Sequence, residues 1–98
     1  MSIATTILAQ LGGAGRLSAM IGARDFMDNG NGLGFRFTAK GTRSINRVRV
    51  TLAPDDTYTV EFWSVRGVNA TLVATVSDVY ADSLRETIEH YTGLALSL

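Results

Sequence analysis

Hydrophobic and polar residues alternate through the middle of the chain with the two-residue period of a β-strand. Residues 33–39, 46–52 and 58–65 each place apolar side chains on one face and polar side chains on the other. Residues 71–77 form a fourth, less polarised stretch. The connections between these stretches are short, which favours antiparallel neighbours. The middle of the chain is therefore predicted to be a β-meander.

The first residues have the spacing of a short amphipathic helix rather than of a strand. Within residues 3–11, one helical face would carry Ile3, Ile7, Leu8 and Leu11. Ser2 is a suitable N-cap, and Gly12-Gly13 supplies a stop. The next segment, 16–23, alternates loosely and is interpreted as a strand. Residues 25–32, DFMDNGNG, combine Gly, Asn and Asp and are interpreted as a turn or loop.

The C-terminal part returns to a helical period. Residues 79–92 are predicted to form a helix that begins at a cap on Asp78 and ends at Gly93. The apolar stripe of this helix would consist of Tyr80, Leu84, Ile88 and Tyr91. After it, an extended tail would carry on one face Leu94, Leu96 and Leu98. Because the last residue is apolar, we expect the terminus to be docked on the core.

These elements predict a single domain over residues 1–98, of the α+β class. We expect an antiparallel meander of four to five strands, with the N- and C-terminal helices packed on one face. Hydrophobic residues make up 46% of the chain, which is enough apolar material for a core. The opposite face of the sheet would then remain open.

Matching apolar positions fixes a predicted strand register. Between 46–52 and 58–65 it sets Leu52 opposite Tyr58, Val50 opposite Val60, and Val48 opposite Phe62. On the outer face, Arg49 then lies opposite Glu61 as an ion pair, and Arg47 lies opposite Trp63 as a cation–π pair.

The same rule applied to 33–39 and 46–52 sets Phe37 opposite Val48 and Phe35 opposite Val50. Arg36 would then lie opposite Arg49, so that one carboxylate, Glu61, faces two guanidinium groups. This predicts an excess of positive charge beside Trp63.

Basic residues gather in the middle of the chain, where no acidic residue occurs between Leu33 and Leu52. They are Arg36, Lys40, Arg43, Arg47 and Arg49. Two interpretations stay open. The outer face is either a solvated sheet surface with ordinary salt bridges, or a binding surface of Arg36, Arg47, Arg49, Glu61 and Trp63, with Lys40 and Arg43 available to an anion in the loop 40–44.

Charge and composition narrow the classes of function. Nine basic and nine acidic residues cancel, which argues against non-specific binding to duplex DNA. The chain has no Cys, so a disulfide framework and a thiolate metal site are excluded. The N-terminus lacks the charged start of a signal peptide, and no apolar run is long enough to span a membrane. We expect a soluble protein of the cytoplasm, without contact to a membrane.

No residues suggest catalysis, a metal or a cofactor. The one histidine, His90, has no assignable nucleophile or orienting carboxylate. Asp55-Asp56 after Pro54 is typical of a turn. The glycines of 12–16 lack the Lys-Ser/Thr of a phosphate loop, and 28–34 lacks the closing Glu of a calcium loop.

Four segments resemble a family of small uncharacterised proteins carried by bacteriophages, prophages and related mobile elements. They are GARDF (22–26), GLGFRF (32–37), INRVRVTLAPDDTYTVEFWSVRG (45–67) and VYADSLRETIEHYTGLALSL (79–98). The resemblance covers nearly the whole chain from Gly12 and carries no established activity and no site residues. It implies a phage origin, and small phage proteins of this size often inhibit host defence, modulate host enzymes or sequester nucleotides.

Three functions follow as hypotheses. The first is a non-enzymatic interaction protein that binds a host or phage protein through the outer face, for example as an inhibitor of a host defence system or host enzyme. The second is a protein that binds nucleic acid or a (cyclic) nucleotide, with Trp63 stacking on a base and the arginines holding phosphate. The third, an enzyme, is the least favoured, because no nucleophile–base pair or metal cluster is visible.

Overall fold

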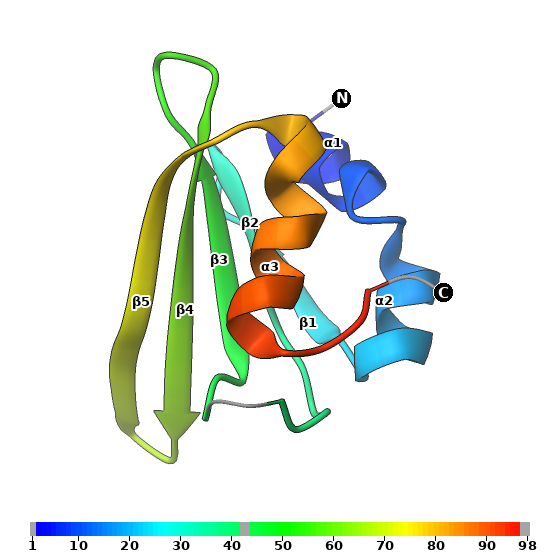
Figure 1. The fold of residues 1–98 in the computed structure, drawn as a ribbon, viewed down its shortest axis with the longest axis vertical. Helices are drawn as coiled ribbons and strands as arrows, with labels where there is room; N and C mark the ends of the chain where they lie inside the picture. Colours follow the sequence, from blue (N-terminus) through cyan, green and yellow to red (C-terminus); the bar gives the residue numbers. More distant parts are fainter. Residues whose placement is uncertain (1, 42–43, 97–98) are drawn as a thin grey trace.

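The computed structural model describes residues 2–41 and 44–96. Five antiparallel strands form one sheet in the order of the chain. They are β1 (Arg24–Asp28), β2 (Gly32–Arg36), β3 (Arg47–Leu52), β4 (Tyr58–Arg66) and β5 (Asn69–Val79). Helices α1 (Ile3–Gln10), α2 (Ala14–Ile21) and α3 (Leu84–Thr92), and the 3-10 helix η1 (Ala81–Ser83), lie on one side of this sheet (Figure 1). The predicted α+β meander with helices on one face is confirmed.

The core lies between the helices and the inner face of the sheet. Fully buried side chains from both layers fill it: Ile7, Leu11, Phe35, Val48, Val50, Val60, Phe62, Leu84 and Ile88 are at most 2% exposed. Phe62 stacks on Tyr91 of α3, with ring centroids 4.9 Å apart and an interplanar angle of 12°. The apolar side chains at alternate strand positions therefore pack against those at every fourth helix position, and together they form one apolar layer.

The register of β3 and β4 is the predicted one. Val50 lies opposite Val60, Arg49 opposite Glu61, and Arg47 opposite Trp63. Because a shift by one residue would turn every apolar side chain of β3 to solvent, the apolar pattern specifies this pairing strongly.

The predicted register of β2 and β3 is wrong by two residues. Phe35 lies opposite Val48 and Leu33 opposite Val50, so Arg36 faces Arg47 instead of Arg49. A shift by two keeps every side chain on its face, so the apolar pattern cannot distinguish the two registers. Beyond the strands, the Phe37 N–H donates to the Asn46 carbonyl at 3.0 Å, which fixes the observed alignment.

Residues 16–23 do not form the predicted strand, because α2 covers Ala14–Ile21. Leu17 and Ile21 are buried and lie four residues apart, one turn along a helix. Gly22 then ends the helix in the left-handed conformation, with φ of 69°. Two buried anchors in so short a segment are too few to show the helical period.

Residues 25–32 are not only a loop, because β1 occupies Arg24–Asp28 and pairs with β2. Four of its five residues are exposed, so it shows no clean alternation of burial. Phe26 attaches it to the core, with its ring centroid 5.6 Å from that of Phe35. β1 is therefore held mainly by its backbone pairing with β2 at the edge of the sheet, and less by burial of apolar side chains.

The start of the C-terminal helix also differs from the prediction. β5 continues to Val79, and Asp78 lies within it with φ of 58°, so it is no helix cap. Tyr80 is 64% exposed and does not belong to the buried stripe. The α-helix begins only at Leu84 instead of residue 79. It ends before Gly93, which is in the left-handed conformation, and this end is the predicted one.

The C-terminal tail packs on the helix layer, as far as the structure describes it. Leu96 is fully buried, and its N–H donates to Glu89 Oε2 at 2.8 Å. Leu94 packs against the core as a partly buried residue. The predicted contribution of Leu98 lies outside the described residues.

The β3–β4 loop contains the predicted turn, with Asp56 at φ of 66°. The Thr57 hydroxyl donates to Asp55 Oδ1 at 2.7 Å, and the Thr57 N–H donates to the same oxygen at 3.2 Å. These hydrogen bonds, the hydroxyl first, lower the pKa of Asp55 below its ordinary value of 3.8. The turn is thus stabilised by the ionised carboxylate.

Replacing Thr57 by valine should raise the pKa of Asp55 toward 3.8, because it removes the hydroxyl donor and keeps the shape. Since the folded pKa is the lowered one, this stabilisation is present above 3.8 and is lost as the pH falls through the folded pKa. Carboxyl titration by NMR measures the change, and Thr57→Ser is the matched control. An unchanged pKa in Thr57→Val would show that the hydroxyl is not the cause.

Candidate binding groove on the outer face of the sheet

The face of the sheet opposite the helices presents two cross-strand rows of side chains. One row runs through Arg36, Arg47, Trp63 and Leu72. The other runs through Gly34, Arg49, Glu61 and Thr75. Because alternate residues of a strand point to opposite faces, both rows follow directly from the buried positions on the inner face.

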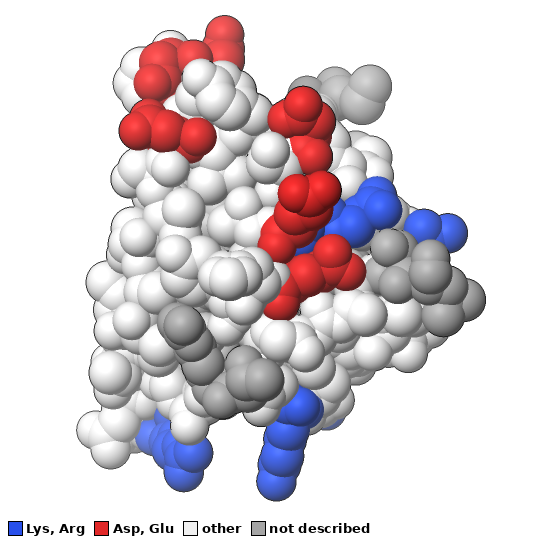
Figure 2. Space-filling view, viewed as in Figure 1, with Lys and Arg blue, Asp and Glu red and all other residues white. Residues whose placement is uncertain are grey.

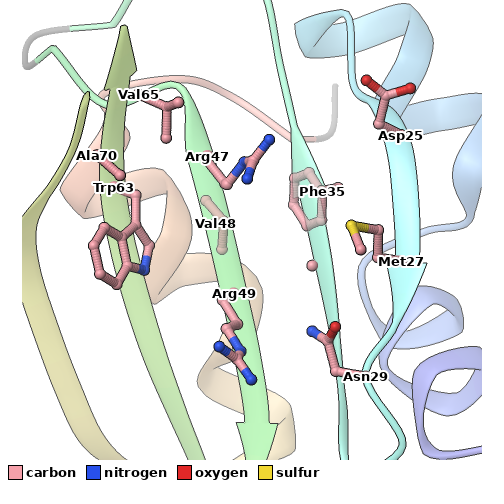
Figure 3. A pocket seen from close by; sticks show the side chains of 11 residues that line it. Asp25, Met27, Asn29, Phe35, Arg47, Val48, Arg49, Trp63, Val65 and Ala70 are labelled. Atoms are coloured by element: carbon pink, nitrogen blue, oxygen red, sulfur yellow. The ribbon is translucent and has the colours of Figure 1, made fainter. Parts of the chain in front are cut away.

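A groove of about 330 Å³ lies in this outer face. Gly34 of β2 lines it and contributes no side chain, and the side-chain amide of Asn29 lies close to this glycine. Its remaining lining comes from all five strands and the β1–β2 turn: Asp25, Met27, Asn29, Phe35, Arg47, Val48, Arg49, Trp63, Val65 and Ala70 (Figure 3). The groove therefore combines apolar walls with two guanidinium groups.

Arg47, Arg49 and Trp63 line the same groove, as the predicted binding surface requires. The two arginines are exposed and the indole is half-buried. Arg47 extends toward β2 and away from the indole (Figure 3). The predicted cation–π stack of Arg47 on Trp63 is therefore not formed, although the two residues are cross-strand neighbours.

The predicted ion pair of Arg49 with Glu61 is not formed either. Among residues 2–41 and 44–96, the one salt bridge joins Arg36 Nε to Asp25 Oδ2. Asp25 reaches this position at the irregularity of β1, where its φ is 56°. Arg36 is thus neutralised, whereas Arg47 and Arg49 have no acidic partner in the described part of the chain.

Asn46 holds β4 beside the groove. Its side-chain amide donates to the Val65 carbonyl at 2.8 Å, and its side-chain oxygen accepts from the Val65 N–H at 2.9 Å. Its backbone N–H donates to the Trp63 carbonyl at 3.0 Å. These three hydrogen bonds continue the β3–β4 ladder past Arg47 and fix the backbone of β4 from the Trp63 carbonyl to Val65.

The other predicted site residues lie outside this groove. Arg36 lines a neighbouring hollow of about 220 Å³ with Arg24 and Arg47. Lys40 lines a further hollow together with Arg66. Glu61 is half-buried next to Arg49 in the ladder but does not line the groove. Arg43 lies outside the described residues.

One wall of the groove, supplied by β1 and its turn, is not predicted from the sequence; it consists of Asp25, Met27 and Asn29. The residues of this segment are mostly polar, which is typical of a loop. A signal was present in Asn29-Gly30 and Asn31-Gly32, since Asn-Gly pairs are typical of tight hairpin turns that require a strand on each side.

The helix side of the molecule has a different electrostatic character. Acidic side chains form a column over the helix layer in Figure 2, where η1 and α3 carry Asp82, Glu86 and Glu89. The basic middle of the chain and its acidic C-terminal part therefore lie on different faces instead of pairing with each other. The groove keeps its positive charge because these carboxylates are on the opposite side of the sheet.

Other chemistry is not apparent in the described residues. No cluster of three or more His, Cys, Asp or Glu side chains that could hold a metal ion occurs there. His90 is exposed on α3 and makes an edge contact with Tyr91, with centroids 5.3 Å apart. Within the same residues, no helix has the length and apolar character needed to cross a bilayer.

Comparisons with known proteins assign no family. No protein-family model matches the chain, and neither the curated proteins nor the solved structures provide a match. The groove itself is therefore the basis for a functional proposal.

Proposed function

We propose that this protein is a non-enzymatic binding protein that holds a protein partner in the outer-face groove. The observation that carries the proposal is the presence of two arginines without acidic partners beside a half-buried tryptophan in one hollow. Arg and Trp are the residue types most enriched at the energetic centres of protein interfaces.

The charges favour a partner segment that carries a carboxylate. A guanidinium group matches a carboxylate with two parallel hydrogen bonds, and Arg47 and Arg49 lie two residues apart on the same face of β3. Met27 is 57% exposed at the opposite wall, so an apolar side chain of the partner would find contacts there. Because the arginines are unpaired, the partner would not have to break an existing ion pair.

The resemblance to small phage and prophage proteins supports a partner from the infected host. We propose a host defence protein or a host enzyme, inhibited by occupation of one of its surfaces in the host cytoplasm. A small protein with a rigid sheet is suited to this role because little conformational entropy is lost on binding.

A nucleotide is a second candidate ligand, favoured by the size of the groove. A volume of about 330 Å³ lies at the lower end of the roughly 300–1,000 Å³ typical of small-molecule sites. Trp63 could stack on a base while the arginines contact phosphate, as in proteins that bind single strands. A phosphate ligand would be held chiefly by charge and would therefore be sensitive to salt.

The fluorescence of Trp63 tests the proposal, because it is the single tryptophan of the chain and lines the groove. The probes are a host protein retrieved by affinity capture, linear and cyclic nucleotides, and a single-stranded oligothymidine. We expect the host protein to change the emission and to shield the indole from a soluble quencher.

Affinity for the host protein should fall only modestly as salt increases. A steep salt dependence together with a response to nucleotides would favour the second candidate. A captured protein that binds without altering the emission or the quenching of Trp63 would contradict a groove-based function. Arg16→Ala, on the exposed surface of α2, is the control for a general loss of positive charge.

A further inference from the structure

β5 is an edge strand of eleven residues that no other element covers. It pairs with β4 on one side, and its other side faces solvent at the margin of the sheet (Figure 1). Its residues from Asn69 to Ser77 are mostly exposed and include no charged residue and no proline. Such an edge presents a row of unpaired backbone N–H and C=O groups that can pair with another strand.

The opposite edge of the sheet is protected. β1 has five residues, carries Arg24, Asp25 and Asp28, and is irregular between Arg24 and Met27. Charge, short length and irregularity are the features by which edge strands avoid pairing. β5 also has two register shifts relative to β4, which twist the strand but introduce neither charge nor proline.

Exposed large hydrophobic residues follow β5 closely. In the described part of the chain they are Met27, Val68, Leu72, Val73 and Tyr80, and all except Met27 lie on β5 or directly at its ends. Val68 is 101% and Tyr80 64% exposed. Scattered surface hydrophobics need no explanation, but four along one open edge indicate a contact surface.

We propose that β5 pairs in antiparallel orientation with β5 of a second copy, so that the two sheets become one. A two-fold axis at Ala74, the middle of β5, would place Val68 of each copy near Tyr80 of the other. The same axis would place Leu72 near Val76 of the second copy. The exposed hydrophobic residues at the two ends of the strand thus complement each other through the symmetry.

Charge favours a second copy as the occupant. In a two-fold symmetric pairing, β5 of one copy lies against β5 of the other. A charged side chain near the axis would therefore lie close to the same charge on the second copy. The stretch from Asn69 to Ser77 has none. Because the charged β1 edge does not continue the sheet, the assembly would close at two copies.

This arrangement leaves the groove accessible and does not depend on its ligand. An axis perpendicular to the sheet keeps both helix layers on one side and both outer faces on the other. The two β4 strands would be three strand spacings apart, about 14–15 Å. The dimer would therefore present two grooves on one surface.

The test is the molar mass of the intact chain by light scattering and sedimentation over a concentration series. We expect a dimer, and amide hydrogen exchange within Ala70–Val76 that slows as the dimer forms. Val73→Lys/Thr75→Lys places like charges opposite each other at the axis and should weaken the dimer at least about tenfold. Thr75 lies opposite Glu61 in the monomer, so a lysine there is compatible with the folded chain.

Thr51→Lys is the matched control, because it adds a charge to the outer face of the central strand β3 away from the edge. It should leave the dimer intact. A wild-type chain that stays monomeric with fast-exchanging β5 amides would overturn the proposal. A dimer that Val73→Lys/Thr75→Lys does not weaken, or a β5 that pairs with a different protein instead of a second copy, would overturn it as well.

Discussion

Replacing Phe62 by alanine should lower the free energy of unfolding by about 3–5 kcal/mol. The side chain is fully buried on β4, opposite Val48, and its ring stacks on Tyr91 of α3. The substitution removes the contact between the sheet and the C-terminal helix and leaves a cavity between two layers. For a domain of 98 residues this loss could exceed half of the total stability.

Chemical denaturation followed by circular dichroism measures this effect. Met27→Ala is the matched control, because it removes a large side chain that is 57% exposed and should change stability by about 1 kcal/mol or less. A Phe62→Ala variant that unfolds at the same denaturant concentration as the wild type would show that the inner face of β4 is not the core.

The strand faces could be predicted from sequence, whereas one strand register could not. The alternation of Val48, Val50 and Leu52 determines which side of β3 is buried and, with a five-residue loop, fixes its alignment to β4. β2 and β3 are joined by the longer segment 37–46, so two alignments that differ by two residues satisfy the same alternation. The choice between the two alignments depends on backbone hydrogen bonds such as that between Phe37 and Asn46. Such bonds are not visible in the order of apolar and polar residues along the sequence.

Two element types were predicted wrongly because burial was weak or interrupted. α2 has two buried anchors, Leu17 and Ile21, and β1 is a mostly exposed edge strand. The N-terminal helix could be predicted because Ile7 and Leu11 repeat the helical period and Ser2 caps it, accepting from the Thr5 N–H at 3.1 Å.

The candidate site could be predicted in part. Arg47, Arg49 and Trp63 follow from the outward positions of β3 and β4, whose register the sequence determines. The β1 wall and the pairing of Arg36 with Asp25 depend on a strand that the sequence did not indicate. The place of Gly34 in the groove, beside the Asn29 amide, likewise depends on which neighbours flank it, and a glycine alone does not reveal that.

The double substitution Arg47→Ala/Trp63→Ala removes the two groove residues that lie opposite each other on β3 and β4. Neither side chain belongs to the buried core, so the free energy of unfolding should change by about 1 kcal/mol or less. Binding of the captured host protein should weaken by at least about 2 kcal/mol, the scale of an interface hot spot and roughly a 30-fold change in Kd.

The measurement that tests the central claim most directly is a calorimetric binding titration and a thermal melt on this same variant. The matched control, Arg16→Ala/His90→Ala, removes an arginine and an aromatic ring from the exposed helix side and should bind like the wild type. Intact folding with weakened binding is the result that a working groove predicts. Intact folding with unchanged binding would contradict it and would leave Arg47, Arg49 and Trp63 as the solvated face of the sheet.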